Sequence, residues 1–222
     1  MNNTKNTYPS SVPAQSQPHQ PGVQEMMYPE PEIIKASHQG SNKLKNKVAL
    51  ISGGDSGIGR SIAVLFAREG ADIAIIYLEE QQDAEKTKQL VEEEGQHCLL
   101  FKEDVTDPDI GLKCVEEILK VFGQINILIN NAGVQFQQHD LLDIDNEQLE
   151  KTFRTNIFSM FYLTKAVLPY LKEGDSIINT TSITSYHGHD VLIDYSSTKG
   201  AITTFTRSLS TNLMKQKKKV FG

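Results

Sequence analysis

Apolar and polar positions follow two alternating patterns over residues 47–215 of the chain. Short continuous apolar runs, which are typical of strands buried on both faces, alternate with stretches whose apolar residues recur at helical spacing. Strands are predicted at 48–51, 73–77, 97–101, 125–129 and 176–179, and helices at about 61–68, 80–94, 107–122, 147–172 and 194–215. This alternation predicts a single α/β domain, a doubly wound parallel sheet with helices on both faces and right-handed crossovers.

Two of the predicted helices contain residues with positional meaning. Asp107 and Pro108 are suited to begin the third helix, as its capping residue and its first helical residue. Asn156 lies inside the long fourth helix, although asparagine is a poor helix former. Its presence there indicates a local kink, a surface position or a functional contact, and the sequence leaves all three open.

Residues 1–45 differ in composition from the rest of the chain. Six of the eight prolines lie at positions 9, 13, 18, 21, 29 and 31, with Gln, Ser and His between them. Such a segment buries too little apolar surface to offset its ordering entropy, so we expect an extended Pro/Gln-rich arm. Ile33 and Ile34 are its candidate anchors on the domain formed by residues 46–222.

The chain has 222 residues, a formal net charge of −6 and an isoelectric point near 5.5. This acidic balance argues against a nucleic-acid or anionic-membrane partner, and the lysines within 217–219 are expected to be solvated. No apolar stretch reaches the length of a membrane span, and the first residues lack the apolar core of a signal peptide. Cys98 and Cys114 are each isolated, without metal-ligand spacing. We therefore expect a soluble, cytoplasmic protein.

Residues 52–59, Ser-Gly-Gly-Asp-Ser-Gly-Ile-Gly, connect the first predicted strand to the first predicted helix. Glycines let the backbone turn sharply and approach a ligand, and a helix N-terminus offers unpaired N–H groups and partial positive charge. A strand, a glycine-rich turn and a helix in this order favour a phosphate site. A tight turn without a ligand would contain the same glycines, so the rest of the chain must decide.

Polar residues also follow the later strands. Asp104 and Val105 follow the third strand, Asn-Asn-Ala-Gly at 130–133 ends the fourth, and Ser182 follows the fifth. Ligands of open parallel sheets bind outside the carboxyl ends of the strands, where the strand order reverses. The polar clusters at this edge of the sheet therefore support a ligand site at the glycine-rich turn.

Tyr195 and Lys199 are four residues apart at the start of the last predicted helix, so their side chains share one face. An ammonium near a phenol favours the phenolate and lowers the phenol pKa from its usual value near ~10. A phenol tuned in this way exchanges a proton with a carbonyl or alcohol oxygen, and the Ser182 hydroxyl is placed to bond the same oxygen. The alternative is an ordinary tyrosine and lysine on a helix surface.

At these residues the chain resembles the short-chain dehydrogenase/reductase family. Residues 52–59 match the family's cofactor turn TGxxxGxG with serine in the first position, and residues 130–133 match its NNAG segment. The arm also resembles the N-terminal extension of a bacterial subgroup. The resemblance implies a Rossmann-like fold and the catalytic residues Asn156, Ser182, Tyr195 and Lys199. The cofactor-binding residues it implies are Gly53, Asp55, Ser56, Gly57, Ile58, Gly59, Tyr77, Asp104, Val105, Asn131, Ala132, Gly133, Tyr195 and Lys199.

The resemblance also implies a reaction, the interconversion of an alcohol and a carbonyl with hydride transfer to or from NAD(P). Tyr195 exchanges the proton, Ser182 polarises the substrate oxygen, and Lys199 both biases Tyr195 and holds the nicotinamide ribose. Asn156 holds a water that links Lys199 to solvent. The implied partners are a small-molecule alcohol or carbonyl substrate and further copies of the chain, in a homo-tetramer for the intact family fold.

Tyr77 ends the second strand, where relatives that prefer NAD often carry Asp for the adenosine ribose. No Arg or Lys stands there for a 2′-phosphate, Ser56 is neutral, and Glu79 and Glu80 follow with negative charge. NAD is therefore predicted over NADP, which stays as the alternative.

A metal site is the other chemistry to weigh. His187, His189 and Asp190 lie between Ser182 and Tyr195, and the sequence shows no further ligand for them. We expect a solvated or substrate-side loop and no metal.

The family pattern continues past the last predicted helix of this chain. Family members add a sixth strand, a Pro-Gly turn at the nicotinamide, a substrate-covering segment and a seventh strand. We therefore expect a domain that lacks the last strands and exposes the fifth at the edge of the sheet. One hypothesis for the ending is the loss of one adenine from the codons of residues 217–219.

The leading interpretation is an NAD(P)-dependent oxidoreductase. One alternative is an inactive fragment that at most binds dinucleotide or associates with intact subunits. Another is a redox-sensing protein that binds the cofactor as a signal.

Overall fold

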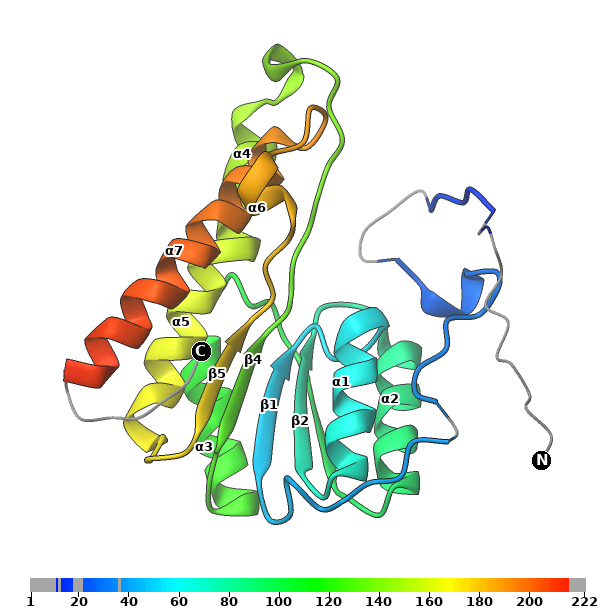
Figure 1. The fold of residues 1–222 in the computed structure, drawn as a ribbon, viewed down its shortest axis with the longest axis vertical. Helices are drawn as coiled ribbons and strands as arrows, with labels where there is room; N and C mark the ends of the chain where they lie inside the picture. Colours follow the sequence, from blue (N-terminus) through cyan, green and yellow to red (C-terminus); the bar gives the residue numbers. More distant parts are fainter. Residues whose placement is uncertain (1–10, 12, 18–21, 36, 216–222) are drawn as a thin grey trace.

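The computed structural model describes residues 11, 13–17, 22–35 and 37–215. Its strands are β1 (Val48–Ser52), β2 (Asp72–Tyr77), β3 (Cys98–Lys102), β4 (Ile127–Asn130) and β5 (Ser176–Asn179). They form one parallel sheet in the order β3-β2-β1-β4-β5 (Figure 1). The chain thus moves outward from β1 in one direction and then in the other, which confirms the predicted doubly wound α/β fold. The order reverses between β1 and β4, so a crevice is expected at their carboxyl ends.

Both faces of the sheet are covered because β1 supplies apolar residues to each. Val48 and Leu50 belong to one apolar cluster, and Ala49 and Ile51 belong to the other. The main helices are α1 (Gly57–Arg68), α2 (Gln81–Glu93), α3 (Ile110–Phe122), α4 (Asn146–Phe153), α5 (Ser159–Val167) and α7 (Ile193–Lys215). Helices α1 and α2 cover the face of Ala49, and helices α3, α5 and α7 contribute to the cluster of Leu50 (Figure 1).

The third helix begins later than the sequence predicts. Helix α3 starts at Ile110, with Asp109 as the residue that precedes it. The Asp107 carboxylate instead accepts a hydrogen bond from Asp109 N at 2.9 Å. Aspartate side chains often bond the backbone two residues on, and this local turn competes with helix formation. The prediction that Asp107 caps the helix and Pro108 begins it was therefore wrong.

The helix predicted at 147–172 is a continuous path in several helical forms. A π-helical segment, η3 (Arg154–Phe158), joins α4 to α5, and a 3₁₀ turn, η4 (Leu168–Tyr170), follows α5. Asp145 caps the start of α4, where its carboxylate accepts a hydrogen bond from Gln148 N at 2.7 Å. Asn156 lies in the π-helical segment and is fully buried, so a surface position is excluded. Single π turns inside helices are often found at functional sites.

Two short elements between β4 and α7 were not predicted, η2 (Leu141–Asp143) and α6 (Thr184–His187). Elements of three or four residues are too short to show an apolar period. Together with α4 and the first turns of α7, they rise beyond the carboxyl ends of the strands (Figure 1). This part of the molecule forms one wall above the edge of the sheet.

The described part of the N-terminal segment lies beside α1 and α2 (Figure 1). It contains one 3₁₀ turn, η1 (Gln24–Met26). Gln24 is only 4 % exposed, whereas Met26 and Tyr28 are 63 % and 77 % exposed. Ile33, like its neighbour at position 34, is partly buried, as expected of an anchor. A buried glutamine, which the composition did not indicate, therefore also attaches this segment.

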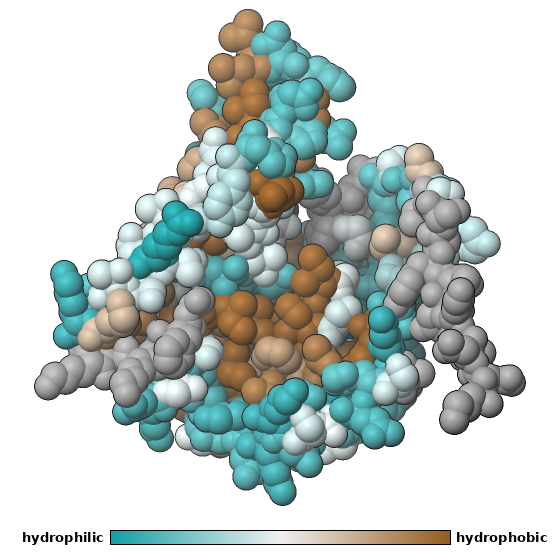
Figure 2. All heavy atoms as spheres, in the orientation of Figure 1, coloured by the Kyte–Doolittle hydropathy of each residue, from teal (hydrophilic) through white to brown (hydrophobic). Residues whose placement is uncertain are grey.

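Strand β5 is the edge strand beyond β4 in the described sheet. Ile178 pairs in register with Ile129, so the two side chains lie on the same face of the sheet. Helices α1 and α2 cover this face over the neighbouring strands. Ile178 is nevertheless 41 % exposed, and Figure 2 shows apolar surface gathered in the middle of this view. None of the helices in the described residues is both long enough and apolar enough to cross a bilayer. The lysines at 217–219 lie outside the described residues.

Candidate active site

The glycine-rich turn is fixed to the end of β4 by a serine. Ser52 Oγ accepts hydrogen bonds from Asn131 N at 3.0 Å and from Ala132 N at 3.1 Å. In return, Asn131 Nδ2 donates to the Gly53 carbonyl at 3.0 Å. These bonds close the crevice between β1 and β4 at its base. The serine that replaces the threonine of the TGxxxGxG pattern thus joins the two strands where their order reverses.

Two glycines of the turn are required by the space around them. Gly53 has φ of +62°, a left-handed conformation that L side chains rarely adopt, and its Cβ would lie 3.1 Å from Ala132 Cα. A Cβ on Gly59 would collide with the Gly53 carbonyl. The backbone of the turn is therefore packed so closely that only glycine fits at positions 53 and 59. Such a cradle suits the close approach of a pyrophosphate to backbone N–H groups.

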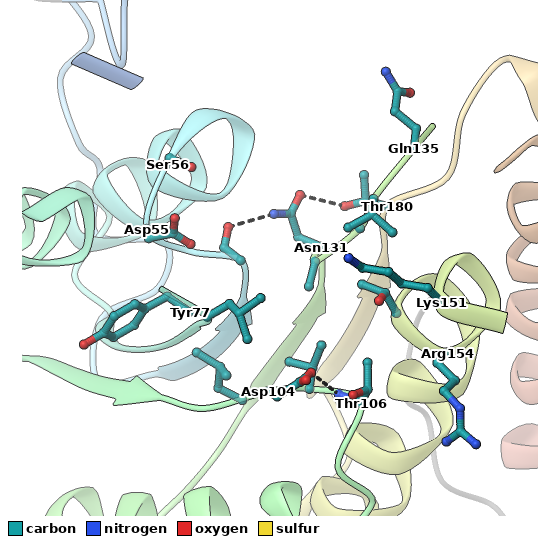
Figure 3. A pocket seen from close by; sticks show the side chains of 18 of the residues that line it. Asp55, Ser56, Tyr77, Asp104, Thr106, Asn131, Gln135, Lys151, Arg154 and Thr180 are labelled. Carbon is teal, nitrogen blue, oxygen red and sulfur yellow. Dashed lines mark hydrogen bonds between the residues drawn. The ribbon is translucent and has the colours of Figure 1, made fainter. Parts of the chain in front are cut away.

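A cleft of about 680 Å³ opens at the carboxyl ends of the strands. Its lining includes twelve of the predicted cofactor residues: Gly53, Asp55, Ser56, Ile58, Tyr77, Asp104, Val105, Asn131, Ala132, Gly133, Tyr195 and Lys199. Gly57, Gly59, Asn156 and Ser182 are not part of the lining. Figure 3 shows Asp55 and Tyr77 on one side of the cleft, Lys151 and Arg154 on the other, and Asn131 between them.

A buried ion pair lies behind the glycine-rich turn. Arg60 donates to the Asp83 carboxylate at 2.6 Å, and the two side chains are 3 % and 2 % exposed. Arg60 Nε also donates to the Asp55 carbonyl at 3.0 Å and to Thr87 Oγ1 at 2.9 Å. The Thr87 hydroxyl donates to the same Asp55 carbonyl at 2.7 Å. The backbone of the turn is thus held from α2 through paired, desolvated charges, which are strongly stabilising only while both partners are present.

Carboxylates gather on the side of the cleft formed by the glycine-rich turn and the ends of β2 and β3. Asp55, Glu103 and Asp104 all line it there. Burial raises the pKa of the Asp55 carboxyl above its ordinary value. Burial also raises the pKa of Tyr77, whose hydroxyl donates to Gln81 Oε1 at 2.5 Å. This end of the cleft therefore disfavours a further negative charge.

Tyr195 and Lys199 meet at the opposite end of the cleft, on the first turns of α7. Lys199 Nζ lies 5.4 Å from the centre of the Tyr195 ring and donates to the Thr180 carbonyl at 2.8 Å. The lysine is 3 % exposed, and burial lowers its pKa to about 8. The spacing of four residues thus places a desolvated ammonium against the phenol.

Asn156 supports this end of the cleft from the π-helical segment. Its Oδ1 accepts from Val134 N at 2.7 Å, and its Nδ2 donates to the Val134 carbonyl at 2.9 Å and to Thr198 Oγ1 at 3.1 Å. Gly133 is close by, since a Cβ there would lie 3.3 Å from Asn156 Oδ1 and 3.8 Å from Lys199 Nζ. Asn156 therefore couples the segment after β4 to α7 from within a local distortion of the helix.

Ser182 lies at the N-terminal side of α6 and is half-buried. Its hydroxyl oxygen accepts hydrogen bonds from Thr184 N at 3.2 Å and from Thr184 Oγ1 at 3.1 Å.

His187 lies in α6, and His189 Nδ1 is 3.2 Å from the Asp190 carboxylate on an exposed loop. The described residues contain no cluster of three or more His, Cys, Asp or Glu suited to a metal.

Sequence reasoning missed a wall of the cleft. Glu147, Glu150, Lys151 and Arg154 line it from α4 and the start of η3. These positions recur at the spacing of three and four that defines one face of a helix, so the signal was present in the sequence. Thr180 was also missed, because its carbonyl and not its side chain holds Lys199.

Comparisons with known proteins agree with this geometry. Residues 47–221 match the family model described as short chain dehydrogenase. The chain is 51 % identical over 208 residues to General stress protein 39 of Bacillus subtilis, across 94 % of this chain and 73 % of that protein. It is 43 % identical to NADPH-dependent aldehyde reductase 1, chloroplastic, of Arabidopsis thaliana, across 94 % of this chain and 74 % of that protein.

Solved structures show the same likeness. A short-chain dehydrogenase from Burkholderia cenocepacia in complex with NADP superposes with a TM-score of 0.75 at 29 % identity, over 80 % of this chain and 71 % of that one. A glucose/ribitol dehydrogenase of the same type from Brucella melitensis gives 0.72 at 30 % identity, over 79 % and 73 % of the two chains. The chain therefore belongs to the short-chain dehydrogenase/reductase family, whose members are oxidoreductases that bind a nicotinamide dinucleotide.

Proposed function

We propose that the protein is a dinucleotide-dependent oxidoreductase that interconverts an alcohol and a carbonyl, with Tyr195 as the acid and base. One observation carries this proposal: the buried Lys199 ammonium lies 5.4 Å from the centre of the Tyr195 ring, in the cleft that the glycine-rich turn also lines. A site for a phosphate and a site for proton transfer thus share one cavity. That arrangement suits hydride exchange between a bound dinucleotide and a small substrate.

The residues of the cleft fit the dinucleotide in two respects. The turn at Gly53 and Gly59 has no room for a Cβ, which leaves backbone N–H groups accessible to phosphate oxygens. Asp104 and Val105 line the cleft and would contact the adenine ring, and Lys199, which also lines it, would hold the nicotinamide ribose. When it is bound, the dinucleotide supplies or accepts the hydride.

The protein's own groups then handle the proton and the charge. Tyr195 donates its phenolic proton to the substrate oxygen in the reductive direction and recovers one in the oxidative direction. The Lys199 ammonium stabilises the phenolate that forms, because an opposite charge in a dry site acts strongly. Ser182 polarises the same substrate oxygen by donating its hydroxyl proton, because its Oγ is only an acceptor toward Thr184, and Asn156 holds the Val134 backbone that borders the site.

We propose NAD as the preferred cofactor. The support is the acidic side of the cleft, where Asp55, Glu103 and Asp104 would repel a 2′-phosphate. NADP is a second candidate, because one relative is named an NADPH-dependent reductase and one similar structure contains NADP. Titration calorimetry with NADH and NADPH decides between them, and tighter binding of NADPH would contradict the preference for NAD.

The proposed reaction is tested by incubating the purified chain with NADH or NADPH and a panel of aldehydes and ketones. We expect oxidation of the dinucleotide together with an equimolar amount of alcohol product. Binding of the dinucleotide without any turnover on the panel would favour a binding protein over an enzyme.

A further inference from the structure

The N-terminal segment makes a direct contact with the phosphate-binding turn through Gln24. Its side-chain oxygen Oε1 accepts a hydrogen bond from Gly57 N at 2.6 Å. Its backbone N–H donates to Asp83 Oδ2 at 3.0 Å, on the same carboxylate that pairs with Arg60. Gln24 is 4 % exposed, so these bonds are shielded from water. A residue of the segment is thus part of the buried network that holds the turn.

The bond to Gly57 replaces a missing helix cap. Gly57 is the first residue of α1, and Ser56, which precedes it, makes no capping hydrogen bond with its side chain. A helix begins with N–H groups that have no partner inside the helix, and Gln24 takes the first of them. Within the part of the chain that the structure describes, the N–H groups of Ile58 and Gly59 donate to no such partner. Two donors at the mouth of the turn therefore stay available for a phosphate.

The same segment forms part of the cleft without filling it. Gly22 lines the cavity together with Ser56 and Ile58. With the segment in this position the cavity has a volume of about 680 Å³. Gly57 itself has φ of +53° and open space around its Cβ position, so its own packing does not fix it. Glycine adopts this left-handed conformation without strain, and the bond from Gly57 N to Gln24 is a contact from outside the turn that fixes its position.

We propose that Gln24 is a positioning residue for the dinucleotide. By accepting from Gly57 N and bonding Asp83, it holds the start of α1 so that the next two N–H groups meet the pyrophosphate. The inference rests on the proposed dinucleotide site, and it adds that the N-terminal segment is a working part of that site. Loss of the bond should weaken binding of any ligand that carries the pyrophosphate and leave the proton chemistry at Tyr195 unchanged.

The test replaces Gln24 by methionine, which keeps the length of the side chain and removes the acceptor. Titration calorimetry measures Kd for NADH and for ADP-ribose, which has the pyrophosphate but no nicotinamide. We expect both Kd values to rise about tenfold, the effect of one well-placed hydrogen bond. KM for NADH should rise in parallel, while kcat at saturating NADH stays within twofold of wild type. Gln15→Met is the matched control, because the described bonds of Gln15 go to Tyr28 within the same segment and not to the turn, and it should bind NADH like wild type.

Several results would overturn the proposal. The first is a Kd for NADH in Gln24→Met that stays within twofold of wild type, and the second is an equal loss of affinity in Gln15→Met. The third is tighter NADH binding by Gln24→Met, and the fourth is a wild-type chain that binds neither NADH nor ADP-ribose. Tighter binding would mean that Gln24 competes with the phosphate for Gly57 N. If Gln24→Met does not fold, Gln24→Asn keeps the amide on a shorter side chain, which moves its oxygen away from Gly57 N, and it must weaken NADH binding as well. Binding is measured directly, without turnover. A wild-type chain that binds NADH but reduces no carbonyl would therefore contradict the proposed reaction and leave this inference standing.

Discussion

Two buried cations lie near the cleft, one behind the glycine-rich turn and one in the lining beside Tyr195, and their surroundings differ. Arg60 is paired with the Asp83 carboxylate at 2.6 Å and bonds the backbone of the glycine-rich turn. Among the described residues, Lys199 has the Thr180 carbonyl as its only acceptor and no carboxylate within ion-pair distance. A paired charge holds structure, whereas an unpaired one has a lowered pKa and can act on a neighbour. We propose that the difference separates a binding end from a chemical end.

The largest expected effect is at the chemical end. Tyr195→Phe removes the proton donor, so turnover should fall by about 10²–10⁴-fold while Kd for NADH stays within twofold. Steady-state kinetics and calorimetry on the same preparation measure both. Tyr170→Phe, at an exposed tyrosine of η4 outside the cleft, is the control and should leave both values unchanged. A Tyr195→Phe variant that keeps most of its activity would remove the assigned role.

At the binding end, Asp83→Asn leaves the Arg60 guanidinium buried without a counter-charge. The free energy of unfolding in urea should fall by about 3–5 kcal/mol, because breaking a buried pair strands a desolvated charge. The matched variant Glu92→Gln removes a half-exposed partner of Lys88 and should change stability much less. Equal effects in the two variants would contradict the view that Arg60 has a structural role.

The unpaired state of Lys199 predicts a pH dependence of stability. Burial holds its folded pKa at about 8, below the ordinary value of 10.5, so the folded state binds the proton more weakly. Between these two pH values the unfolded chain carries more protons, and stability should rise with pH by up to about 3 kcal/mol from this residue. The measurement is the difference in unfolding free energy between wild type and Lys199→Met at pH 7, 8, 9 and ~10. Subtraction cancels Cys98 and Cys114, whose raised pKa values of about 12 act in the opposite direction in both proteins. A flat difference would mean that Lys199 is not desolvated.

The smallest expected effect concerns selectivity. Asp55→Asn removes one buried carboxylate from the acidic side of the cleft and keeps the carbonyl that Arg60 and Thr87 bind. NADPH affinity should rise several-fold relative to NADH affinity, because less negative charge then faces a 2′-phosphate. Calorimetry on the variant and the wild type gives the ratio. An unchanged ratio would place the 2′ position elsewhere in the cleft.

Local patterns were enough to predict the sheet and much of the cleft. Continuous apolar runs such as Val48–Ser52 need burial on both faces, and that need alone implies parallel strands with helices on each side. The glycine-rich turn and the pair formed by Tyr195 and Lys199 are close in sequence, so spacing places them.

Contacts between distant residues were beyond such reasoning. Gln24 bonds Gly57, which lies 33 positions later in the sequence. The composition of the segment that contains Gln24 indicates an extended arm and no such contact. The pair of Arg60 and Asp83 similarly appears in sequence as two charged residues on separate helices. The start of α3 was misplaced because a local turn at Asp107 competes with the cap. In these cases a polar group finds its hydrogen-bond or charge partner on another part of the chain or in a local turn. Which partner it finds depends on the folded structure.

The most direct test of a division between a binding end and a chemical end follows the hydride itself. The chain is supplied with NADH deuterated at the transferable position of nicotinamide C4, together with aldehydes and ketones, and the alcohols are analysed by mass spectrometry. We expect one deuterium on the carbinol carbon with wild type, and about 10²–10⁴-fold less product with Tyr195→Phe at the same NADH occupancy. Bound NADH with no deuterium in any alcohol, or equal transfer by the two proteins, would contradict it.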